Sequence, residues 1–269
     1  MRIALYQCSS GPLDVAGNLG RLRSQAHSAA ERQVQLLVTP EMFLTGYNIG
    51  HAHVRQLAQP RDGSMAQQVG ALAREFGVAI IYGYPECDDQ GQLFNSVQCI
   101  DSQGNARGNY RKSHLFGELD RSMFAPGDDA WPIIELNGWR LGMLICYDLE
   151  FPENVRRVAL AGADLIVVPT ANMLPYEFIA DVTVRSRAFE NQCVVAYANY
   201  CGHEGAIEYC GLSSVVAADG KPLAQAHHSE SLIIATLDRD ALVASRQAFP
   251  YLRDRRAELY TELANNTSN

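Results

Sequence analysis

Three reactive side chains follow segments of the chain that have the pattern of buried strands. Glu41 follows the run LLVTP, Cys146 follows an apolar run from Leu141 to Ile145, and Lys112 follows a short strand that ends at Tyr110-Arg111. Ligand sites of open α/β sheets gather beyond the carboxyl ends of strands, so we expect the three to share one cleft. Cys146 would then act as nucleophile, Glu41 as general base and acid, and Lys112 as the cation that stabilises an oxyanion.

Each of these residues could also have a purely structural role. Free cysteines are usually small core residues, so Cys146 could simply be packed. Glu41 follows a proline and could cap a helix or form a surface ion pair, and Lys112 next to Arg111 could be solvated.

A cysteine–histidine hydrolase is the competing catalytic assignment. His114 would be the first candidate partner of Cys146 and His203 the second, although loop histidines are more often structural. A zinc site is poorly supported, because the cysteines and histidine of the loop-rich stretch lack paired ligand spacing; they are Cys193, Cys201, His203 and Cys210. We therefore predict no metal and no cofactor.

Alternating apolar strands and amphipathic helices would position the three residues. We expect strands at 2–8, 35–39, 78–84, 93–100, 108–111, 131–135, 139–145, 164–168, 193–198, 212–217 and 232–237. Helices are expected at 15–32, 64–76, 152–161, 176–190 and 239–249. Loops are expected at 46–60, with a short helix at best, and at 114–129 and 199–209. Cys146 would then lie where a strand meets a helix start, which favours a thiolate.

The two halves of the chain contain similar sequence segments. VQLLVTPEM (Val34–Met42) resembles ADLIVVPTANM (Ala163–Met173), and both halves contain near-continuous Val, Ile and Leu runs. Such runs are typical of strands buried on both faces. We predict an α/β fold of two sheets packed face to face with helices outside. Residues 1–240 would form the main domain, and residues 241–269 a C-terminal helix and polar tail lying on its surface or on a partner subunit.

The composition is that of an ordinary globular protein. The 269 residues are 47% hydrophobic and 19% charged, with a net charge of −8. No basic run stands out, which argues against nucleic acid or an anionic membrane as a partner. The seven cysteines include no C-x-x-C pair, and no signal peptide or membrane-length apolar run is present, so we expect reduced thiols in the cytoplasm.

Several longer stretches, taken together, resemble the nitrilase superfamily of carbon–nitrogen hydrolases, in its aliphatic amidase-like branch. They are LLVTPEMFLTGY (Leu36–Tyr47), YRKSHLFGELD (Tyr110–Asp120), LICYDLEFPE (Leu144–Glu153), ADLIVVPTAN (Ala163–Asn172) and RSRAFENQCVVAYAN (Arg185–Asn199). The resemblance implies a four-layer αββα sandwich, a Glu-Lys-Cys triad on Glu41, Lys112 and Cys146, and a homodimer or higher homo-oligomer.

The chain departs from the family pattern at one position. Many relatives carry a second glutamate six residues before the Pro-Gly turn, where this chain has Asp120, with Glu118 two residues away. Asp is one methylene shorter, so either acid could support Lys112. The backbone N–H of Tyr147 is a further candidate, as a donor to the oxyanion.

The resemblance also implies the substrate class, a small linear amide such as 5-aminopentanamide from lysine degradation. A terminal ammonium needs an acid or an aromatic face in the pocket. The candidates for substrate binding are Tyr47, Glu150, Asn172, Tyr176 and Tyr197, and further acids are Glu177, Asp181 and Glu204. Other ω-amides, N-carbamoyl amines, nitriles and a non-catalytic scaffold role are the alternatives.

Overall fold

Strand β1 (Arg2–Ser9) lies inside an eight-stranded sheet of the computed structural model, which describes residues 1–128 and 132–260. Along its main path this sheet has the order β11-β10-β1-β2-β3-β4-β5, and β14 pairs antiparallel with β1. The other strands of this sheet are β2 (Leu36–Val38), β3 (Ala79–Cys87), β4 (Leu93–Ile100), β5 (Ala106–Arg111), β10 (Tyr200–Glu204), β11 (Ile207–Cys210) and β14 (Ser231–Thr236).

A six-stranded sheet packs against the first one. Its order is β13-β12-β9-β8-β7-β6, and its central strands β7, β8 and β9 are parallel. These strands are β6 (Ile134–Leu136), β7 (Trp139–Met143), β8 (Leu165–Pro169), β9 (Val194–Ala198), β12 (Ser214–Val216) and β13 (Pro222–Gln225).

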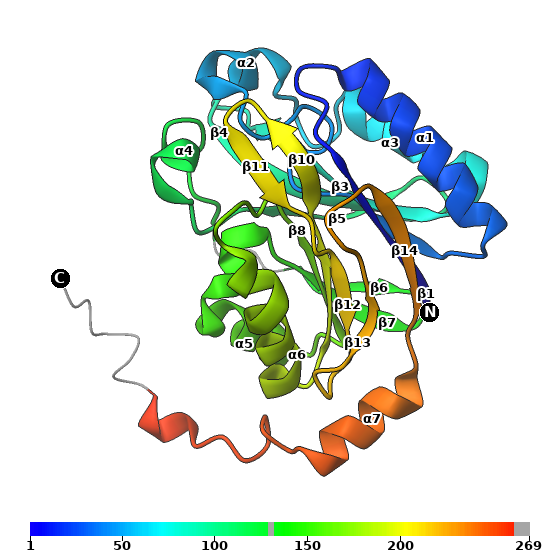
Figure 1. Ribbon diagram of the computed structural model, residues 1–269, viewed down its shortest axis with the longest axis vertical. Coiled ribbons are helices and arrows are strands. Elements are labelled where there is room, and N and C mark those ends of the chain that lie inside the picture. Colours follow the sequence, from blue (N-terminus) through cyan, green and yellow to red (C-terminus); the bar gives the residue numbers. More distant parts are fainter. Residues whose placement is uncertain (129–131, 261–269) are drawn as a thin grey trace.

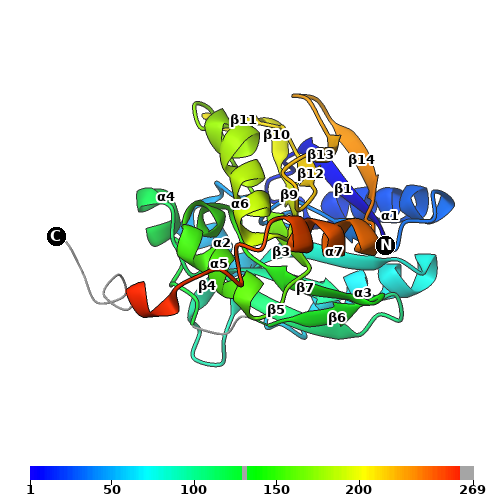
Figure 2. The ribbon, with the colours of Figure 1, turned by 90° about the horizontal axis from the view of Figure 1, so that it is seen from below.

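Helices cover the outer faces of both sheets (Figures 1 and 2). The eight-stranded sheet carries α1 (Val15–Glu31), α2 (Gly50–Leu57) and α3 (Ser64–Phe76), and the six-stranded sheet carries α5 (Pro152–Leu160) and α6 (Val184–Asn191). The shorter elements are α4 (Gly117–Arg121), a 3₁₀ turn at Cys146–Glu150, a π-helical turn at Ile179–Thr183, α7 (Arg239–Ala248) and a 3₁₀ turn at Ala257–Leu259. The predicted αββα sandwich is thus confirmed.

The alternation of side chains along β1 explains the layers. Ile3 and Leu5 point into the core between the two sheets, and Ala4 and Tyr6 point into the core beneath α1 and α3. Successive side chains of a strand face opposite sides, so a strand between two apolar layers must be apolar throughout.

Four expectations about the elements were wrong. The predicted loop 199–209 contains the hairpin of β10 and β11, and the predicted loop 114–129 contains the short helix α4. The strand predicted to stop before Pro85 continues to Cys87, because its pairing with β4 extends that far. The turn at Asp219-Gly220, which lies in sequence between the expected strands 212–217 and 232–237, joins β12 to β13 instead, and β14 belongs to the other sheet.

Two other predicted elements differ from the structure in the residues at which they begin. The helix expected at 176–190 begins at Glu177 and passes through a π-helical turn at Ile179–Thr183 before it continues as α6. The strand expected at 131–135 is β6, which begins at Ile134, and its predicted first residue, Trp131, lies outside the described residues, as does the end of the polar tail at 261–269.

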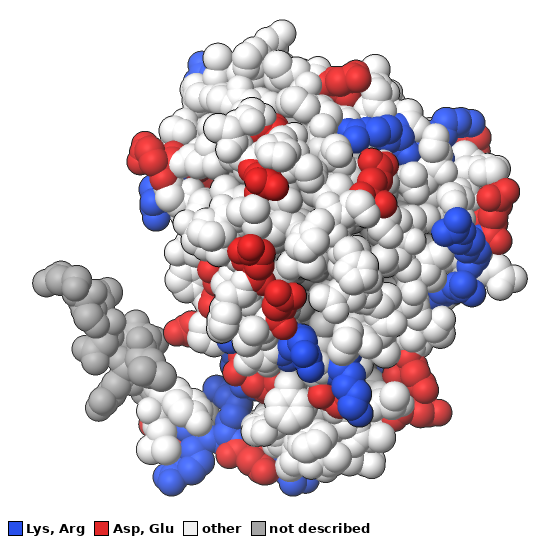
Figure 3. All heavy atoms as spheres, in the orientation of Figure 1, with Lys and Arg blue, Asp and Glu red and all other residues white. Residues whose placement is uncertain are grey.

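The surface mixes charges of both signs. On the face shown in Figure 3, Lys and Arg side chains lie singly or in small groups, mostly near acidic ones. No helix within residues 1–128 and 132–260 combines the length and the apolar character needed to cross a membrane.

Candidate active site

Glu41 lies in a buried turn immediately after β2. Its backbone N–H donates to the carbonyl of Thr170, 3.3 Å away, and so ties the end of one sheet to the end of the other. The turn packs directly on β3 at Gly83, where a Cβ atom would come within 2.3 Å of the Met42 nitrogen, so only glycine fits. The Glu41 side chain is fully buried, which excludes the surface alternative.

Lys112 is also fully buried and bridges two carboxylates. Its Nζ lies 2.7 Å from Oε1 of Glu41 and 2.6 Å from Oδ2 of Asp120. Oε1 of Glu41 also accepts a 2.7 Å hydrogen bond from Asn95, whereas Oε2 is buried and has no hydrogen-bond partner among the described residues. A buried carboxylate oxygen without a hydrogen-bond partner has a lone pair available for a proton from a substrate or a neighbouring thiol.

Asp120 is held by more than its ion pair. Oδ1 accepts from the hydroxyl of Tyr47 at 2.8 Å, and Oδ2 accepts from the backbone N–H of Phe116 at 2.8 Å. Glu118, the alternative acid, is exposed. Of the two acids considered, the structure therefore brings only Asp120 to Lys112.

The burial of these groups determines their protonation. Desolvation raises the pKa of Glu41, although Lys112 opposes the rise. Burial alone would lower the pKa of Lys112, but the carboxylates of Asp120 and Glu41 reverse this and raise that pKa well above its usual value. Lys112 is consequently a permanent cation at neutral pH.

Cys146 begins the 3₁₀ turn that follows β7, and it has a positive φ of 46°. Left-handed backbone is uncommon for a residue with a Cβ and is found at functional sites, where it directs a side chain out of a turn. The thiol is partly exposed. Burial and the nearby Glu41 raise its pKa, while Lys112 and hydrogen bonding from Thr170 act in the opposite direction.

The environment of this cysteine corrects one expectation. A five-residue 3₁₀ turn follows Cys146, and helix α5 begins only at Pro152, so no α-helix N-terminus favours a thiolate here. The thiol is protonated at neutral pH and needs a base to lose its proton.

Asp148 joins the strand end of Cys146 to the loop of Lys112. This buried carboxylate accepts from the hydroxyl of Tyr110 at 2.8 Å, from Ser113 Oγ at 2.8 Å, and from the backbone N–H groups of His114 at 2.9 Å and Ile145 at 3.1 Å. Ile145 directly precedes Cys146 and Ser113 directly follows Lys112. Asp148 therefore fixes the two strand ends relative to each other.

The chain can now be compared with known proteins. The profile of the carbon-nitrogen hydrolase family matches residues 2–247. The chain belongs to this family.

Relatives of this hydrolase include a protein named as a hydrolase and one named as an amidase. A protein of Pseudomonas protegens called hydrolase in pqqF 5'region is 61% identical, over 98% of this chain and 92% of its own length. An (R)-stereoselective amidase of Pseudomonas sp is 35% identical, over 97% of this chain and 94% of its own.

Solved structures agree with this placement. A double mutant of the amidase from Nesterenkonia sp. AN1, in complex with acrylamide, superposes with a TM-score of 0.89 at 33% identity. The match covers 98% of this chain and 97% of that chain. Its mutations replace a glutamate by glutamine and a cysteine by alanine. The protein is thus an amidase-type carbon–nitrogen hydrolase.

Aromatic rings lie on the loops around the nucleophile of this hydrolase. The ring of Phe116 contacts Tyr147 and Tyr176 edge-on, at centroid distances of 5.4 and 5.8 Å, and Tyr147 contacts Phe151 at 4.9 Å. A cavity of about 520 Å³ borders this group and is lined in part by Tyr147, Phe151 and His114. It lies on the Tyr147 side of the nucleophile turn.

The other predicted substrate-binding residues occupy different surroundings. Tyr47 is buried and bound to Asp120, Tyr197 is buried with its hydroxyl accepting from Thr170, and Tyr176 is exposed. The Asn172 side chain is engaged by the protein itself, donating to the carbonyl of Tyr176 and accepting from the N–H of Met173. Of the further acids, Glu204 is bound to Tyr209 and to the backbone at Tyr47 and Asn48, while Glu177 is partly exposed and Asp181 is exposed.

The histidine and metal alternatives gain no support from the geometry. The ring of His114 is bound to Asp148, Ser113 and Asn154, and His203 is exposed. Across the described part of the chain, no cluster of three or more His, Cys, Asp or Glu residues could hold a metal ion.

The sequence patterns missed Asn95 and Thr170. Asn95 lies within β4 and hydrogen-bonds Glu41, and Thr170 follows β8 and lies beside Cys146. Thr170 ends an apolar strand just as Glu41 does, so the same strand-end pattern could have identified it.

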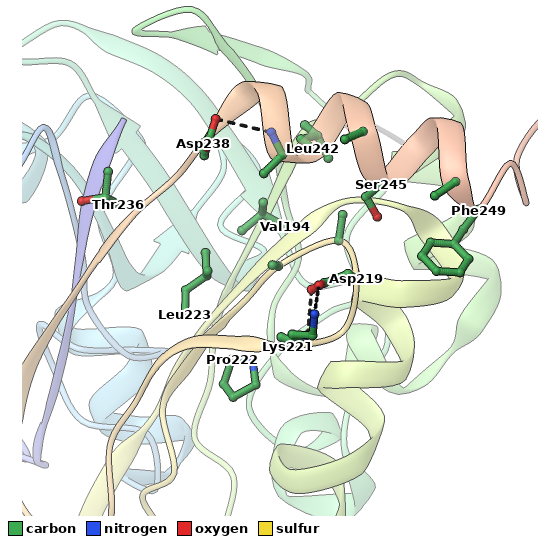
Figure 4. Close-up of a pocket in the computed structure, with 15 residues that line it drawn as sticks. Val194, Asp219, Lys221, Pro222, Leu223, Thr236, Asp238, Leu242, Ser245 and Phe249 are labelled. Atoms are coloured by element: carbon green, nitrogen blue, oxygen red, sulfur yellow. Dashed lines mark hydrogen bonds and ion pairs between the residues drawn. The ribbon is translucent and has the colours of Figure 1, made fainter.

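A second cavity, of about 560 Å³, lies far from these residues, between α7 and the hairpin of β12 and β13 (Figure 4). Leu242, Leu223 and Val194 contribute apolar side chains to its wall, and the ion pair of Asp219 with Lys221 lies at its edge. None of the sequence-predicted site residues lines it.

Proposed function

We propose that this hydrolase uses Glu41, Lys112 and Cys146 to hydrolyse small linear carboxamides, and that 5-aminopentanamide is its substrate. The products would be 5-aminopentanoate and ammonia, which would place the enzyme in lysine degradation. The observation that carries the proposal is the buried Lys112, paired with Glu41 and Asp120 beside a partly exposed thiol.

In the first half-reaction the sulfur of Cys146 bonds to the carboxamide carbon. The thiol proton passes to Glu41, and the charge that develops on the carbonyl oxygen is stabilised by Lys112 and the backbone N–H of Tyr147. The carbon–nitrogen bond then breaks as Glu41 gives its proton to the leaving nitrogen. Ammonia leaves and a thioester remains on Cys146.

In the second half-reaction water replaces the amine. Glu41 takes a proton from the water as its oxygen bonds to the thioester carbon, and the carbon–sulfur bond breaks. The proton on Glu41 returns to the sulfur, so the carboxylic acid leaves and the thiol is restored. The raised pKa of Glu41 suits both roles, because a group that accepts and donates protons near neutral pH works best with a pKa close to that pH.

The test is ammonia release by the purified protein from a panel of compounds. The panel contains 5-aminopentanamide, its neutral isostere hexanamide, an ω-carboxy amide, an N-carbamoyl amine and a nitrile. Highest kcat/KM on 5-aminopentanamide would support the proposal. Carbon dioxide release from the carbamoyl compound would identify an N-carbamoyl amine hydrolase instead. A higher kcat/KM on another compound of the panel would make that compound's class the substrate.

A thiol control accompanies the panel. Cys146→Ala should abolish ammonia release, whereas Cys87→Ala, at the other partly exposed thiol among the described residues, should leave it unchanged. Unchanged turnover by Cys146→Ala would contradict the nucleophile assignment. Assembly as a homodimer or higher oligomer, and a cytoplasmic location, stay predictions.

A further inference from the structure

Glu150 closes the 3₁₀ turn that Cys146 opens. Arg187 fixes the backbone at this end of the turn, since its Nη2 donates to the carbonyl of Glu150 at 2.6 Å and its Nε to that of Leu149 at 2.9 Å. The Glu150 side chain starts from this rigid base and is only partly exposed. Its direction is therefore determined by the same turn that presents the nucleophile.

The carboxylate of Glu150 has no hydrogen-bond or ion-pair partner within residues 1–128 and 132–260, which is unusual for a half-buried acid. The nearest cations, Lys112 and Arg187, both act on its pKa, but their donors are already engaged. Lys112 is bound to Glu41 and Asp120, and Arg187 to two carbonyls and Glu190. Desolvation accordingly raises the pKa of Glu150. A bound cationic ligand would lower the free-energy cost of keeping this partly buried carboxylate charged.

Glu150 lies within electrostatic reach of the reacting groups. Tyr197 is influenced by the charges of both Cys146 and Glu150, and Glu150 itself is influenced by Lys112. Glu41 and Asp120 already place two carboxylates against the single ammonium of Lys112. Glu150 adds a third, so the surroundings of the nucleophile carry an excess of negative charge that attracts a cation.

The dimensions of the turn suit a short ω-amino amide. The four steps from Cys146 to Glu150 in a 3₁₀ turn advance about 8 Å. An extended chain of four methylenes separates an amide carbon from a terminal nitrogen by roughly 6 Å. One end of such a substrate can therefore meet the thiol while the other meets the carboxylate.

We infer that Glu150 is the specificity-determining residue of this site, and that its carboxylate binds a primary alkylammonium group at the far end of the substrate. The inference rests on the proposed amidase function and adds the residue that selects a charged substrate over a neutral one. Glu150 takes no part in bond making or breaking.

The first experiment compares kcat/KM for 5-aminopentanamide and hexanamide in three proteins. These are the wild type, Glu150→Gln, and Glu153→Gln as a matched control, because Glu153 is an exposed glutamate three residues further on. Glu150→Gln loses a charge-assisted hydrogen bond to the substrate ammonium. The ratio of kcat/KM for 5-aminopentanamide to kcat/KM for hexanamide should therefore fall about 10- to 100-fold, mainly because KM for 5-aminopentanamide rises. Its kcat/KM for hexanamide should change much less than that for 5-aminopentanamide, and Glu153→Gln should behave as wild type on both substrates. Glu150→Asp should retain part of the preference, since the charge remains.

The second experiment does not depend on the natural substrate. Pentylammonium and 1-pentanol are tested as competitive inhibitors of propionamide hydrolysis by the same proteins. We expect pentylammonium to inhibit Glu150→Gln at least about tenfold more weakly than the wild type, and 1-pentanol to inhibit both proteins equally. This result supports the inference even if 5-aminopentanamide is not hydrolysed. Equal inhibition of wild type and Glu150→Gln by pentylammonium, or an amine preference that survives in Glu150→Gln, overturns it and leaves the amidase assignment intact.

Discussion

Nζ of Lys112 lies 2.6 Å from Oδ2 of Asp120, and both side chains are fully buried. The pair matters because it leaves Glu41 free to change its protonation state. With only one carboxylate near it, the lysine would hold that carboxylate in its charged form. With Asp120 as a second partner, the lysine would remain paired while Glu41 is neutral in the proposed mechanism.

Asp120→Asn should therefore reduce kcat/KM for amide hydrolysis by about 10²-fold or more, since Lys112 then has only Glu41 to balance it. The exposed Glu118 provides a matched control, and Glu118→Gln should keep wild-type activity. Ammonia release measures both. If Glu118→Gln lost activity and Asp120→Asn kept it, the roles of the two acids would have to be exchanged.

Glu41→Gln should lower kcat by about 10²- to 10⁴-fold, the usual contribution of a general base and acid. The amide can still accept from Asn95 and Lys112, so the variant should fold. Circular dichroism checks the fold, and mass spectrometry of the protein mixed with substrate checks for trapped thioester. Near-normal turnover by a folded Glu41→Gln protein would rule out the base role.

We expect kcat/KM to fall at acidic pH and to stay constant at mildly alkaline pH. Desolvation raises the pKa of Glu41, so kcat/KM should fall as pH decreases through a value above the ordinary glutamate pKa of about 4.3. The raised pKa of Lys112 keeps this side chain charged, and its contribution to stability is present throughout the neutral range and is lost only as pH rises above about 10.5. A pH profile measured with a neutral amide, which excludes substrate ionisation, tests this. A fall in activity between pH 8 and 9 that coincides with unfolding would contradict it.

Asp148→Asn should destabilise the protein by about 2–5 kcal/mol, because several buried hydrogen bonds to one charged acceptor are weakened together. Tyr110→Phe removes a single one of these bonds and should cost less, about 1–2 kcal/mol. Urea unfolding of both variants gives the comparison, with Asp89→Asn at an exposed position as the control. Equal stability of Asp148→Asn and wild type would show that Asp148 does not tie the two strand ends together.

The sequence predicted the layers and the grouping of Glu41 with Lys112 because both depend on local patterns. Continuous apolar runs identified β2, β7 and β8, and reactive residues at two of these strand ends identified Glu41 and Cys146. The hairpin of β10 and β11 was missed because it contains Gly202 and the charged residues His203 and Glu208, which lie on exposed or half-exposed positions of an edge and do not alternate clearly.

Other features depend on contacts between distant segments. The choice of Asp120 over Glu118 is decided by the short helix α4, which turns one acid inward and the other outward. The pairing of β14 with β1 joins residues more than 220 positions apart, and nothing near either strand in the sequence specifies its partner. Such long-range choices become visible only when the whole chain is folded.

The place of β1 in its sheet has a consequence for synthesis of the protein. β1 is synthesised before β14, yet Ile3 and Leu5 pair with Ala235 and Ile233 of β14, more than 220 residues later. This edge of β1 lacks its β14 partner until the intervening residues have been made, and an unpaired apolar strand edge promotes association with other chains. We therefore expect chains truncated before β14 to bind chaperones, and the native sheet to be completed only after β14 has been synthesised.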